Sequence, residues 1–406
     1  MKITVIGAGA AGLIAAGKAA ESGCEVVLLE RNDRVGKKLL ITGKGRCNLT
    51  NNAEIEDMIG MYPTNPKFLY SALYTFTNDD IVELVEKNGV KTKVERGGRV
   101  FPVSDKASDV VKALSKYALK PNVKLVRTRA SGLIIKNGEI KGVRTGKGDI
   151  LCDRVIICTG GKSYPGTGST GDGYELAAQA GHTITEIRPS LVPLETEESF
   201  VRDIMGLALK NVKISAFNDK GKKQYEDFGE MLFTHFGISG PIVLSMSAHL
   251  KNGRRYGIEI DLKPALDEGK LKARIMRDFE KAGKKHLLNS LDALLPKAII
   301  PLIIEKSGIE PHKPVCEITK EERASLIDVM KHFKLTVKCF RPVEEAIVTA
   351  GGVKVSEIDP STMESKKVKG LYFAGEVIDV DGYTGGYNLQ AAFSTGYLAG
   401  MNAAMI

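Results

Sequence analysis

The sequence predicts an α/β fold, in which a Rossmann-like domain is interrupted by an inserted unit. Three observations near the N-terminus carry this prediction. Residues 2–6 read as a short apolar strand, residues 13–22 as an alanine-rich helix, and residues 25–29 as a second apolar strand. Two parallel strands joined by a helix form a right-handed βαβ unit, the building block of a doubly wound sheet.

A glycine fingerprint, Gly7-x-Gly9-x-x-Gly12, lies between the first strand and the helix. The first glycine permits a tight turn, the second lets the backbone approach a pyrophosphate, and the third lets the helix pack on the strand. The helix N-terminus faces the phosphates. Glu30 ends the second strand, where it can accept hydrogen bonds from ribose hydroxyls. An acid there favours an unphosphorylated ribose, so the motif predicts FAD or NAD over NADP.

The loop after Glu30 predicts a second phosphate-contacting segment. Residues 31–52 are rich in glycine, asparagine and lysine. Glycines in this loop allow backbone amides to point inward as an anion nest, and basic side chains add charge. The residues concerned are Gly36, Gly43 and Gly45, with Lys37, Lys38, Lys44 and Arg46. Such a segment suits a dinucleotide that runs extended along the protein.

The pattern changes twice along the chain. Residues 191–262 resemble antiparallel strands, residues 265–333 are mostly helical, and a strand, turn and helix return after Gly370. The length of 406 residues agrees with two or three domains. We therefore expect a Rossmann-like domain made of residues 1–190 and 341–406, an inserted antiparallel β domain at 191–264, and an inserted helical domain at 265–340.

A second glycine match, Gly166-x-Gly168-x-x-Gly171, precedes a helical stretch. It does not predict a separate NAD domain, because no β-strand ending in an acid follows at the required distance. Residues 184–187 lead straight into Arg188-Pro189 instead.

Composition excludes several classes of protein. With 43% hydrophobic and 26% charged residues, the chain is not a disordered protein, a collagen or a coiled coil. No apolar stretch is long enough to span a membrane, and the glycine spacing argues against a signal peptide at residues 2–16. Six cysteines without a C-x-x-C and six scattered histidines predict reduced thiols, no metal site and a cytoplasmic location.

Basic residues are concentrated in one segment. The net charge is +9, whereas residues 86–147 contain 16 Lys and Arg against 5 Asp and Glu, an excess of +11. A local excess of this size can serve an anionic partner such as RNA. A solvated surface that keeps the protein soluble explains the same count, so charge alone leaves both interpretations open.

Several longer segments resemble one family. They are residues 40–51 (Leu-Ile-Thr-Gly-Lys-Gly-Arg-Cys-Asn-Leu-Thr-Asn), residues 158–165 with 168–173, residues 232–241 (Leu-Phe-Thr-His-Phe-Gly-Ile-Ser-Gly-Pro), and residues 371–376 with 385–390. Together with the N-terminal fingerprint they resemble the BaiN/YhiN-like family of FAD-dependent flavoprotein oxidoreductases, nearly end to end.

The resemblance implies FAD bound by a discontinuous Rossmann-like domain, with a β-barrel-like and a helical insert. The residues that it assigns to the cofactor lie in four stretches of the chain and at Ala130. They are Gly7, Gly9, Ala10, Ala11, Gly12, Glu30 and Arg31; Lys38, Gly43, Gly45, Arg46, Cys47, Asn48 and Leu49; Ala130, Thr159, Gly160 and Gly161; and Gly375, Glu376, Gly386, Asn388, Leu389 and Gln390.

By the same resemblance, Glu376 stands where an acid contacts the ribityl chain. The amides of residues 388–390 begin the last helix, and their partial positive charge can lie against N1 and O2 of the flavin. Tyr164 and His235 are the candidate catalytic residues, as a cavity-lining group and a proton donor. Cys47 reads as a packing residue, because no second cysteine lies nearby in sequence.

The leading functional hypothesis is a reductase in which NAD(P)H reduces FAD transiently and hydride passes through flavin N5 to an activated C=C. Its favoured substrate is uridine in ribosomal RNA, reduced to dihydrouridine. One alternative is a flavin oxidase or reductase of a small molecule, such as an aminoketone or a bile-acid-type enone. Another is a non-catalytic flavin-binding RNA partner. The expected partners are a small-molecule electron donor and ribosomal RNA, without a membrane, and the oligomeric state is left open.

Overall fold

The computed structural model describes residues 1–405, and these divide into two compact units. Unit 1 contains Met1–Ser190 and the chain from Pro342 onward, and unit 2 contains Leu191–Arg341. In this described part, no helix has both the length and the apolar character needed to cross a bilayer.

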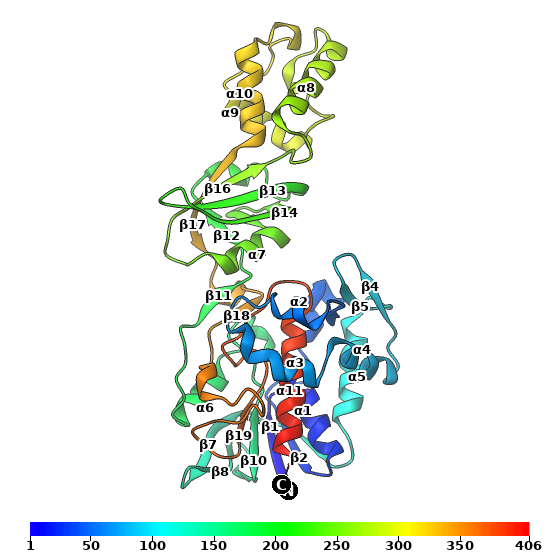
Figure 1. The fold of residues 1–406 in the computed structure, drawn as a ribbon, viewed down its shortest axis with the longest axis vertical. Helices are drawn as coiled ribbons and strands as arrows, with labels where there is room; N and C mark the ends of the chain where they lie inside the picture. Colours follow the sequence, from blue (N-terminus) through cyan, green and yellow to red (C-terminus); the bar gives the residue numbers. More distant parts are fainter. Residues whose placement is uncertain (406) are drawn as a thin grey trace. The chain divides into compact units, whose positions relative to one another are not determined.

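A five-stranded parallel sheet is the centre of unit 1 (Figure 1). Its strands are β1 (Lys2–Ile6), β2 (Glu25–Glu30), β6 (Val123–Arg127), β10 (Arg154–Ile157) and β19 (Leu371–Phe373), in the spatial order β19-β10-β1-β2-β6. Strands β1, β10 and β19 are almost wholly buried, as expected of parallel strands covered on both faces. Counted along the chain, this is the order 3-2-1-4-5 of a Rossmann sheet. The α/β, Rossmann-like prediction is confirmed.

Helices α1 (Ala10–Glu21) and α11 (Tyr387–Ala403) pack closely together against this sheet (Figure 1). Small residues make the close approach possible. A Cβ at Gly396 would lie 2.4 Å from the Ala11 carbonyl oxygen, and one at Gly400 would lie 2.5 Å from that of Ala15. The first and last helices of unit 1 therefore pack with their backbones in direct contact.

We expect Gly400→Val to destabilise unit 1 by about 3 kcal/mol, because the new side chain meets a backbone atom that cannot move aside. The free energy of unfolding measured in urea checks this. The control is Gly146→Val, since nothing lies within 4 Å of a Cβ at Gly146. It should change stability by less than about 0.5 kcal/mol. Equal losses in the two variants would contradict the role of Gly400 in helix packing.

The remaining elements of unit 1 surround the sheet. Two small antiparallel sheets have the orders β3-β5-β4 and β7-β8-β9, and β11 pairs with β18. The strands are β3 (Thr50–Asn51), β4 (Thr92–Glu95), β5 (Arg99–Pro102), β7 (Ala130–Lys136), β8 (Glu139–Thr145), β9 (Ile150–Leu151), β11 (Arg188–Ser190) and β18 (Val348–Ala350). The helices are α2 (Ile55–Ile59), α3 (Tyr70–Thr75), α4 (Asn78–Lys87), α5 (Ala107–Ala118) and α6 (Asp172–Gln179).

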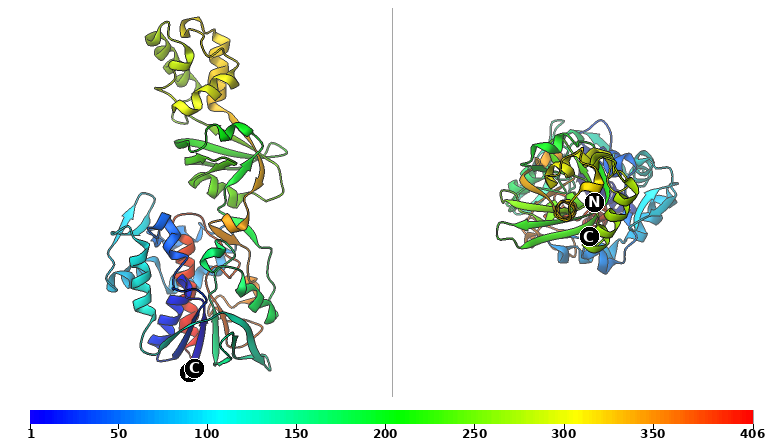
Figure 2. Two further views of the ribbon diagram at one scale, coloured as in Figure 1. Left: turned by 180° about the vertical axis from the view of Figure 1, so that it is seen from behind. Right: turned by 90° about the horizontal axis from the view of Figure 1, so that it is seen from above.

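Unit 2 contains a closed antiparallel barrel with the order β12-β15-β14-β13-β16-β17. Its strands are β12 (Leu194–Thr196), β13 (Ala208–Asn218), β14 (Lys223–Phe233), β15 (Gly237–Ser239), β16 (Tyr256–Asp261) and β17 (Phe333–Phe340). Helix α7 (Pro241–His249) packs on β14. Helices α8 (Glu268–Ala282), α9 (Ile300–Ser307) and α10 (Lys320–Lys331) gather at one end of the barrel (Figure 2).

One expected boundary is wrong. Residues 333–340, assigned above to the helical domain of 265–340, form β17 and close the barrel between β12 and β16. The alternation of buried and exposed residues along β17 explains why it is a strand, since one of its faces points into the barrel.

Candidate functional site

Four segments converge at the carboxyl edge of the parallel sheet. Gly7 follows β1, Glu30 ends β2, Thr159 follows β10 and Glu376 follows β19. The strand order reverses between β1 and β10, and ligands of open α/β sheets bind in the crevice at such a point. The segments meet there, because a Cβ at Gly7 would lie 2.5 Å from the Cys158 carbonyl oxygen.

The glycine turn before α1 has one packed position and one open position. A Cβ at Gly12 would lie 1.8 Å from the Gly7 carbonyl oxygen, whereas nothing lies within 4 Å of a Cβ at Gly9. Helix α1 begins at Ala10 with no side chain capping it, and the N–H groups of its first turn have no partner inside the helix. The amides of Ala10, Ala11 and Gly12 therefore stay candidates to donate to an anion, as the N-termini of helices do.

Glu30 is only 6% exposed. Its Oε2 accepts from the Ala8 N–H at 3.0 Å, and its Oε1 accepts from both nitrogens of Asn32 at 2.8 Å. These bonds hold the carboxylate at the strand end, and its oxygens retain lone pairs for a ribose hydroxyl. The guanidinium of Arg31, by contrast, binds Thr170 and Asp172. Ala130 is buried at the start of β7.

A charged cluster joins the loop of residues 31–52, the second segment predicted to contact phosphate, to the residues that follow β19. Lys38 Nζ donates to Glu376 Oε2 at 2.7 Å and to Ser163 Oγ at 2.7 Å. Glu376 Oε1 accepts from the Thr349 N–H at 2.8 Å and from Ser163 Oγ at 3.2 Å. Burial acts to raise the pKa of Glu376, but the Lys38 ammonium and these hydrogen bonds together hold that pKa below its ordinary value. Glu376 is therefore an anion at neutral pH.

The loop from Gly43 to Leu49 has a contorted backbone. Gly43, Lys44, Gly45 and Cys47 all have positive φ angles, of 56°, 58°, 83° and 60°. Cys47 and Leu49 are fully buried, and burial raises the pKa of the Cys47 thiol to about 12. A thiol with so high a pKa is not a nucleophile at neutral pH, which agrees with a packing role for Cys47.

Two buried side-chain oxygens in the predicted cofactor segments test whether FAD fits. Asn48 Oδ1 and Thr159 Oγ1 are buried and have no hydrogen-bond partner among residues 1–405. Buried polar atoms are ordinarily satisfied, so the Asn48 oxygen suits a ligand with polar edges. The Thr159 oxygen faces α6 instead, because a Cβ at Gly173 would lie 2.0 Å from it. Gly160 and Gly161 follow Thr159 directly, and a Cβ at Gly161 would lie 3.0 Å from Glu376 Oε1. With the open space at Gly9, these features fit an extended dinucleotide.

The last predicted cofactor segment lies at the start of α11. Gly375 and Glu376 follow β19, and Gly386 precedes the helix with no side chain capping it. The Asn388 amide closes the preceding loop by bonding to the Gly382 backbone, and the Gln390 side chain is buried against Thr50 and Ser394. These two side chains fix the helix start, so the backbone amides of this first turn, including Leu389, are the groups left to face a ligand.

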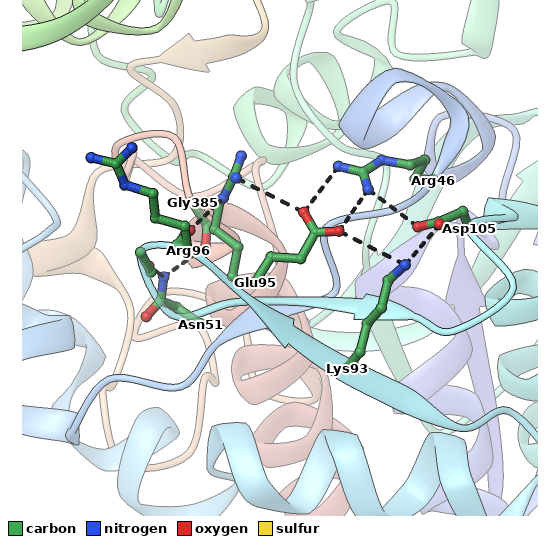
Figure 3. A network of polar contacts seen from close by, with 9 residues as sticks. Arg46, Asn51, Lys93, Glu95, Arg96, Asp105 and Gly385 are labelled. Carbon is green, nitrogen blue, oxygen red and sulfur yellow. Dashed lines mark hydrogen bonds and ion pairs between the residues drawn. The ribbon is translucent and has the colours of Figure 1, made fainter. Parts of the chain in front are cut away.

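The side chain of Arg46, one of the predicted cofactor residues, binds Glu95 and Asp105 (Figure 3). Its guanidinium forms a two-bond ion pair with Glu95, at 2.8 and 3.2 Å, and reaches Asp105 at 3.2 Å. It also lies over the Phe101 ring, 4.1 Å from the centroid. The Arg46 guanidinium thus stabilises a hairpin instead of extending as a free cation, and only its backbone stays a candidate for the cofactor.

The two catalytic candidates belong to different units. Tyr164 lies in unit 1, is 37% exposed and has a left-handed backbone with φ 51°. His235 lies in unit 2, exposed beside the Phe236 ring. The catalytic role of each residue stays a prediction.

Sequence reasoning missed residues that hold the site together. Thr349 Oγ1 accepts from the backbone amides of Lys162 and Ser163, so it fixes the loop after β10. Asn51 Nδ2 donates to the carbonyls of both Gly97 and Gly385. No local pattern marks Thr349, and the motif of residues 40–51 contains Asn51 without indicating its partners, because they are far away in sequence.

Comparison with known proteins identifies the family. A family model described as "HI0933-like protein Rossmann domain" matches residues 1–402. The chain belongs to this family. A "3-dehydro-bile acid delta(4,6)-reductase" from Clostridium scindens is 36% identical, with 99% of each chain covered. A "Ribosomal RNA dihydrouridine synthase" from Haemophilus influenzae is also 36% identical, over 98% of this chain and 97% of that protein.

Membership confirms the resemblance described above, and it places the chain among flavin-dependent oxidoreductases. Among solved structures, a 3-ketosteroid delta1-dehydrogenase from Sterolibacterium denitrificans matches with a TM-score of 0.53 and 14% identity, covering 99% of each chain. That similarity concerns the fold alone.

Proposed function

We propose that this protein is an NAD(P)H-driven, FAD-dependent reductase that converts uridine in ribosomal RNA to dihydrouridine. The observation that carries the proposal is similarity over the whole chain to proteins of that description. The Haemophilus influenzae relative is joined by a "Ribosomal RNA dihydrouridine synthase" from Escherichia coli, 33% identical over 97% of this chain and 95% of that protein.

The surface charge of unit 1 supports an RNA substrate. Nine basic residues between positions 86 and 147 are exposed and have no ion-pair partner among residues 1–405: Lys91, Arg96, Lys106, Lys116, Lys124, Arg127, Lys136, Arg144 and Lys147. Cations that no carboxylate neutralises are available to phosphates.

The residues at the sheet edge have distinct tasks in this proposal. The amides after Gly9 bind the pyrophosphate, Glu30 accepts from the adenosine ribose, and the Lys38–Glu376 pair orients the ribityl region. The first turn of α11 directs partial positive charge at the pyrimidine side of the flavin. When bound, FAD supplies a two-electron carrier that accepts and returns hydride. His235 is the group proposed to deliver the proton that completes reduction of the C=C, and Tyr164 is proposed to line the substrate cavity.

The second glycine motif bears on the electron donor. Gly166, Gly168 and Gly171 precede α6, but the next strand, β11, pairs antiparallel with β18 outside the parallel sheet. This arrangement lacks the βαβ unit that would hold a second dinucleotide. We therefore propose that NAD(P)H binds transiently, reduces the cofactor and leaves before the second substrate binds.

A second candidate function is reduction of a bile-acid-type enone. The Clostridium scindens relative favours it, because its identity of 36% over the whole chain equals that of the Haemophilus influenzae protein. Both candidates share hydride addition to an activated C=C and differ in the substrate.

Anaerobic spectroscopy followed by product analysis tests the proposal. We expect the purified yellow protein to bleach on addition of NADPH or NADH, and the reduced protein to form dihydrouridine in ribosomal RNA that lacks it, detected by nucleoside mass spectrometry. A bile-acid enone is the control substrate. If neither NADPH nor NADH bleaches the flavin, NAD(P)H is rejected as the electron donor. If the protein reduces the enone but not the RNA, the second candidate function, reduction of a bile-acid-type enone, is selected.

A further inference from the structure

We propose that Arg96, at the tip of the β4–β5 hairpin, binds a backbone phosphate of the RNA next to the uridine being reduced. This inference rests on the proposed function and names a contact for that site. The elements that carry it are the position of the hairpin tip, the ion pairs that hold the hairpin and the free guanidinium of Arg96.

The hairpin tip is tied to the segment that precedes α11. Asn51 Nδ2 donates to the Gly97 carbonyl at 3.0 Å and to the Gly385 carbonyl at 3.1 Å (Figure 3). The Asn52 N–H also donates to the Gly98 carbonyl at 2.7 Å. Gly385 stands two residues before the first turn of α11, whose amides are candidates for the flavin. One side chain therefore joins the residue after Arg96 to the cofactor segment.

Ion pairs hold the hairpin rigidly at this place. Both carboxylate oxygens of Glu95 accept hydrogen bonds from the Arg46 guanidinium. The Asp105 carboxylate accepts from Arg46 and, at 2.7 Å, from Lys93 Nζ. Arg99 donates its Nε to the Arg96 carbonyl at 3.0 Å. These contacts therefore hold both strands of the hairpin, and the backbone of Arg96 at its tip is held in place with them. Preorganisation of this kind lowers the entropy cost of binding a ligand.

Arg96 is the arginine of this group that has no partner. Its side chain is exposed, and its guanidinium makes no hydrogen bond or ion pair within residues 1–405. In Figure 3 it points away from the ion pairs. The network itself, with Arg46, Lys93 and Arg99 against Glu95 and Asp105, has a charge of +1, and Arg96 raises the local charge to +2. The tip therefore attracts anions.

The chemistry of the guanidinium selects the ligand class. A planar fork of donors matches two oxygens of one phosphodiester, which a neutral ring does not offer. A phosphodiester lies on each side of every internal uridine in RNA. Arg96 would then hold the strand while the base enters the site, as backbone contacts position a nucleic acid without reading its sequence.

Arg96→Ala and Arg96→Lys test the proposal, with Arg277→Ala as the charge-matched control, since Arg277 on α8 is also exposed and makes no ion pair among residues 1–405, and it lies outside the basic segment of residues 86–147. We expect Arg96→Ala to raise the KM for a ribosomal RNA fragment about tenfold, with kcat and anaerobic bleaching by NADPH unchanged. The salt dependence of RNA binding should become shallower by about one unit of log–log slope. Arg96→Lys should recover part of the loss, and turnover of free uridine or of an uncharged enone should not respond.

A KM and salt slope in Arg96→Ala equal to those of Arg277→Ala would overturn the proposal. An increase in KM for a bile acid carboxylate but not for RNA would assign Arg96 to a small anion and also overturn it. If the wild-type protein forms no dihydrouridine, the proposed function fails separately. In that case the dissociation constant of the RNA fragment tests the contact between Arg96 and the phosphate. A dissociation constant that does not change in Arg96→Ala rejects this contact. Flavin content and the unfolding midpoint verify that each variant is folded.

Discussion

Replacing Gly9 with alanine is expected to weaken FAD binding by at least about tenfold, which is about 1.4 kcal/mol, while leaving the apoprotein folded. Gly9 has φ −85° and ψ −159°, which alanine adopts without strain, and no protein atom lies within 4 Å of the added Cβ. The methyl group would enter space that the pyrophosphate is proposed to occupy. The free energy of unfolding of the apoprotein should fall by less than about 1 kcal/mol.

The matched variant is Gly12→Ala. Its Cβ would lie 1.8 Å from the Gly7 carbonyl oxygen, so it should lose both FAD and stability. Fluorescence titration with FAD and urea unfolding of the apoprotein measure the two effects separately. Wild-type affinity in Gly9→Ala would show that the cofactor does not approach the backbone at this glycine.

Lys38→Met is expected to destabilise unit 1 by about 3 kcal/mol at pH 7, because it leaves the Glu376 carboxylate buried without its counter-charge. The side chains of Lys38 and Glu376 are 24% and 19% exposed, so solvent screens this pair only weakly. In the wild type the folded-state pKa of Glu376 is lowered. Its stabilising contribution is therefore present above the unfolded-state pKa and is lost as pH falls through the folded-state pKa.

Without Lys38, burial is the largest remaining influence on Glu376, and the pKa of that carboxyl should rise. The loss of stability should therefore be largest at neutral pH and should shrink as pH falls, first through the raised pKa of the variant and then through the lowered pKa of the folded wild type. Urea unfolding at pH 7 and pH 4 measures this difference. The double variant Lys38→Met, Glu376→Gln should regain much of the loss.

Lys37→Met is the control for Lys38→Met. Lys37 lies 4.0 Å from Asp33, a side chain that is 78% exposed, and removing such a surface pair should cost less than about 0.5 kcal/mol. An equal loss at both pH values in Lys38→Met would indicate that packing of the lysine chain, and not its charge, supports Glu376.

The N-terminal βαβ unit could be predicted from sequence because its signals are local. Two apolar strands, an alanine-rich helix and three glycines lie within the first 30 residues, and each reports on backbone geometry in its immediate neighbourhood. The same holds for α11, whose start follows a glycine pair. The strand β17 could not be predicted in the same way, because its partners, β12 and β16, lie far earlier in the chain. Its alternation of apolar and polar residues was the one available signal.

The sequence by itself determined the Rossmann-like class, the glycine turn at the head of α1 and the acid that ends β2, since each depends on residues close together along the chain. Only the tertiary structure decided how the side chains are used. It paired Lys38 with Glu376, committed Arg46 to Glu95 and Asp105, and left Arg96 free at the hairpin tip. Such pairings join residues separated by tens to hundreds of positions, and a charge pairs with whichever partner the folded backbone brings within reach.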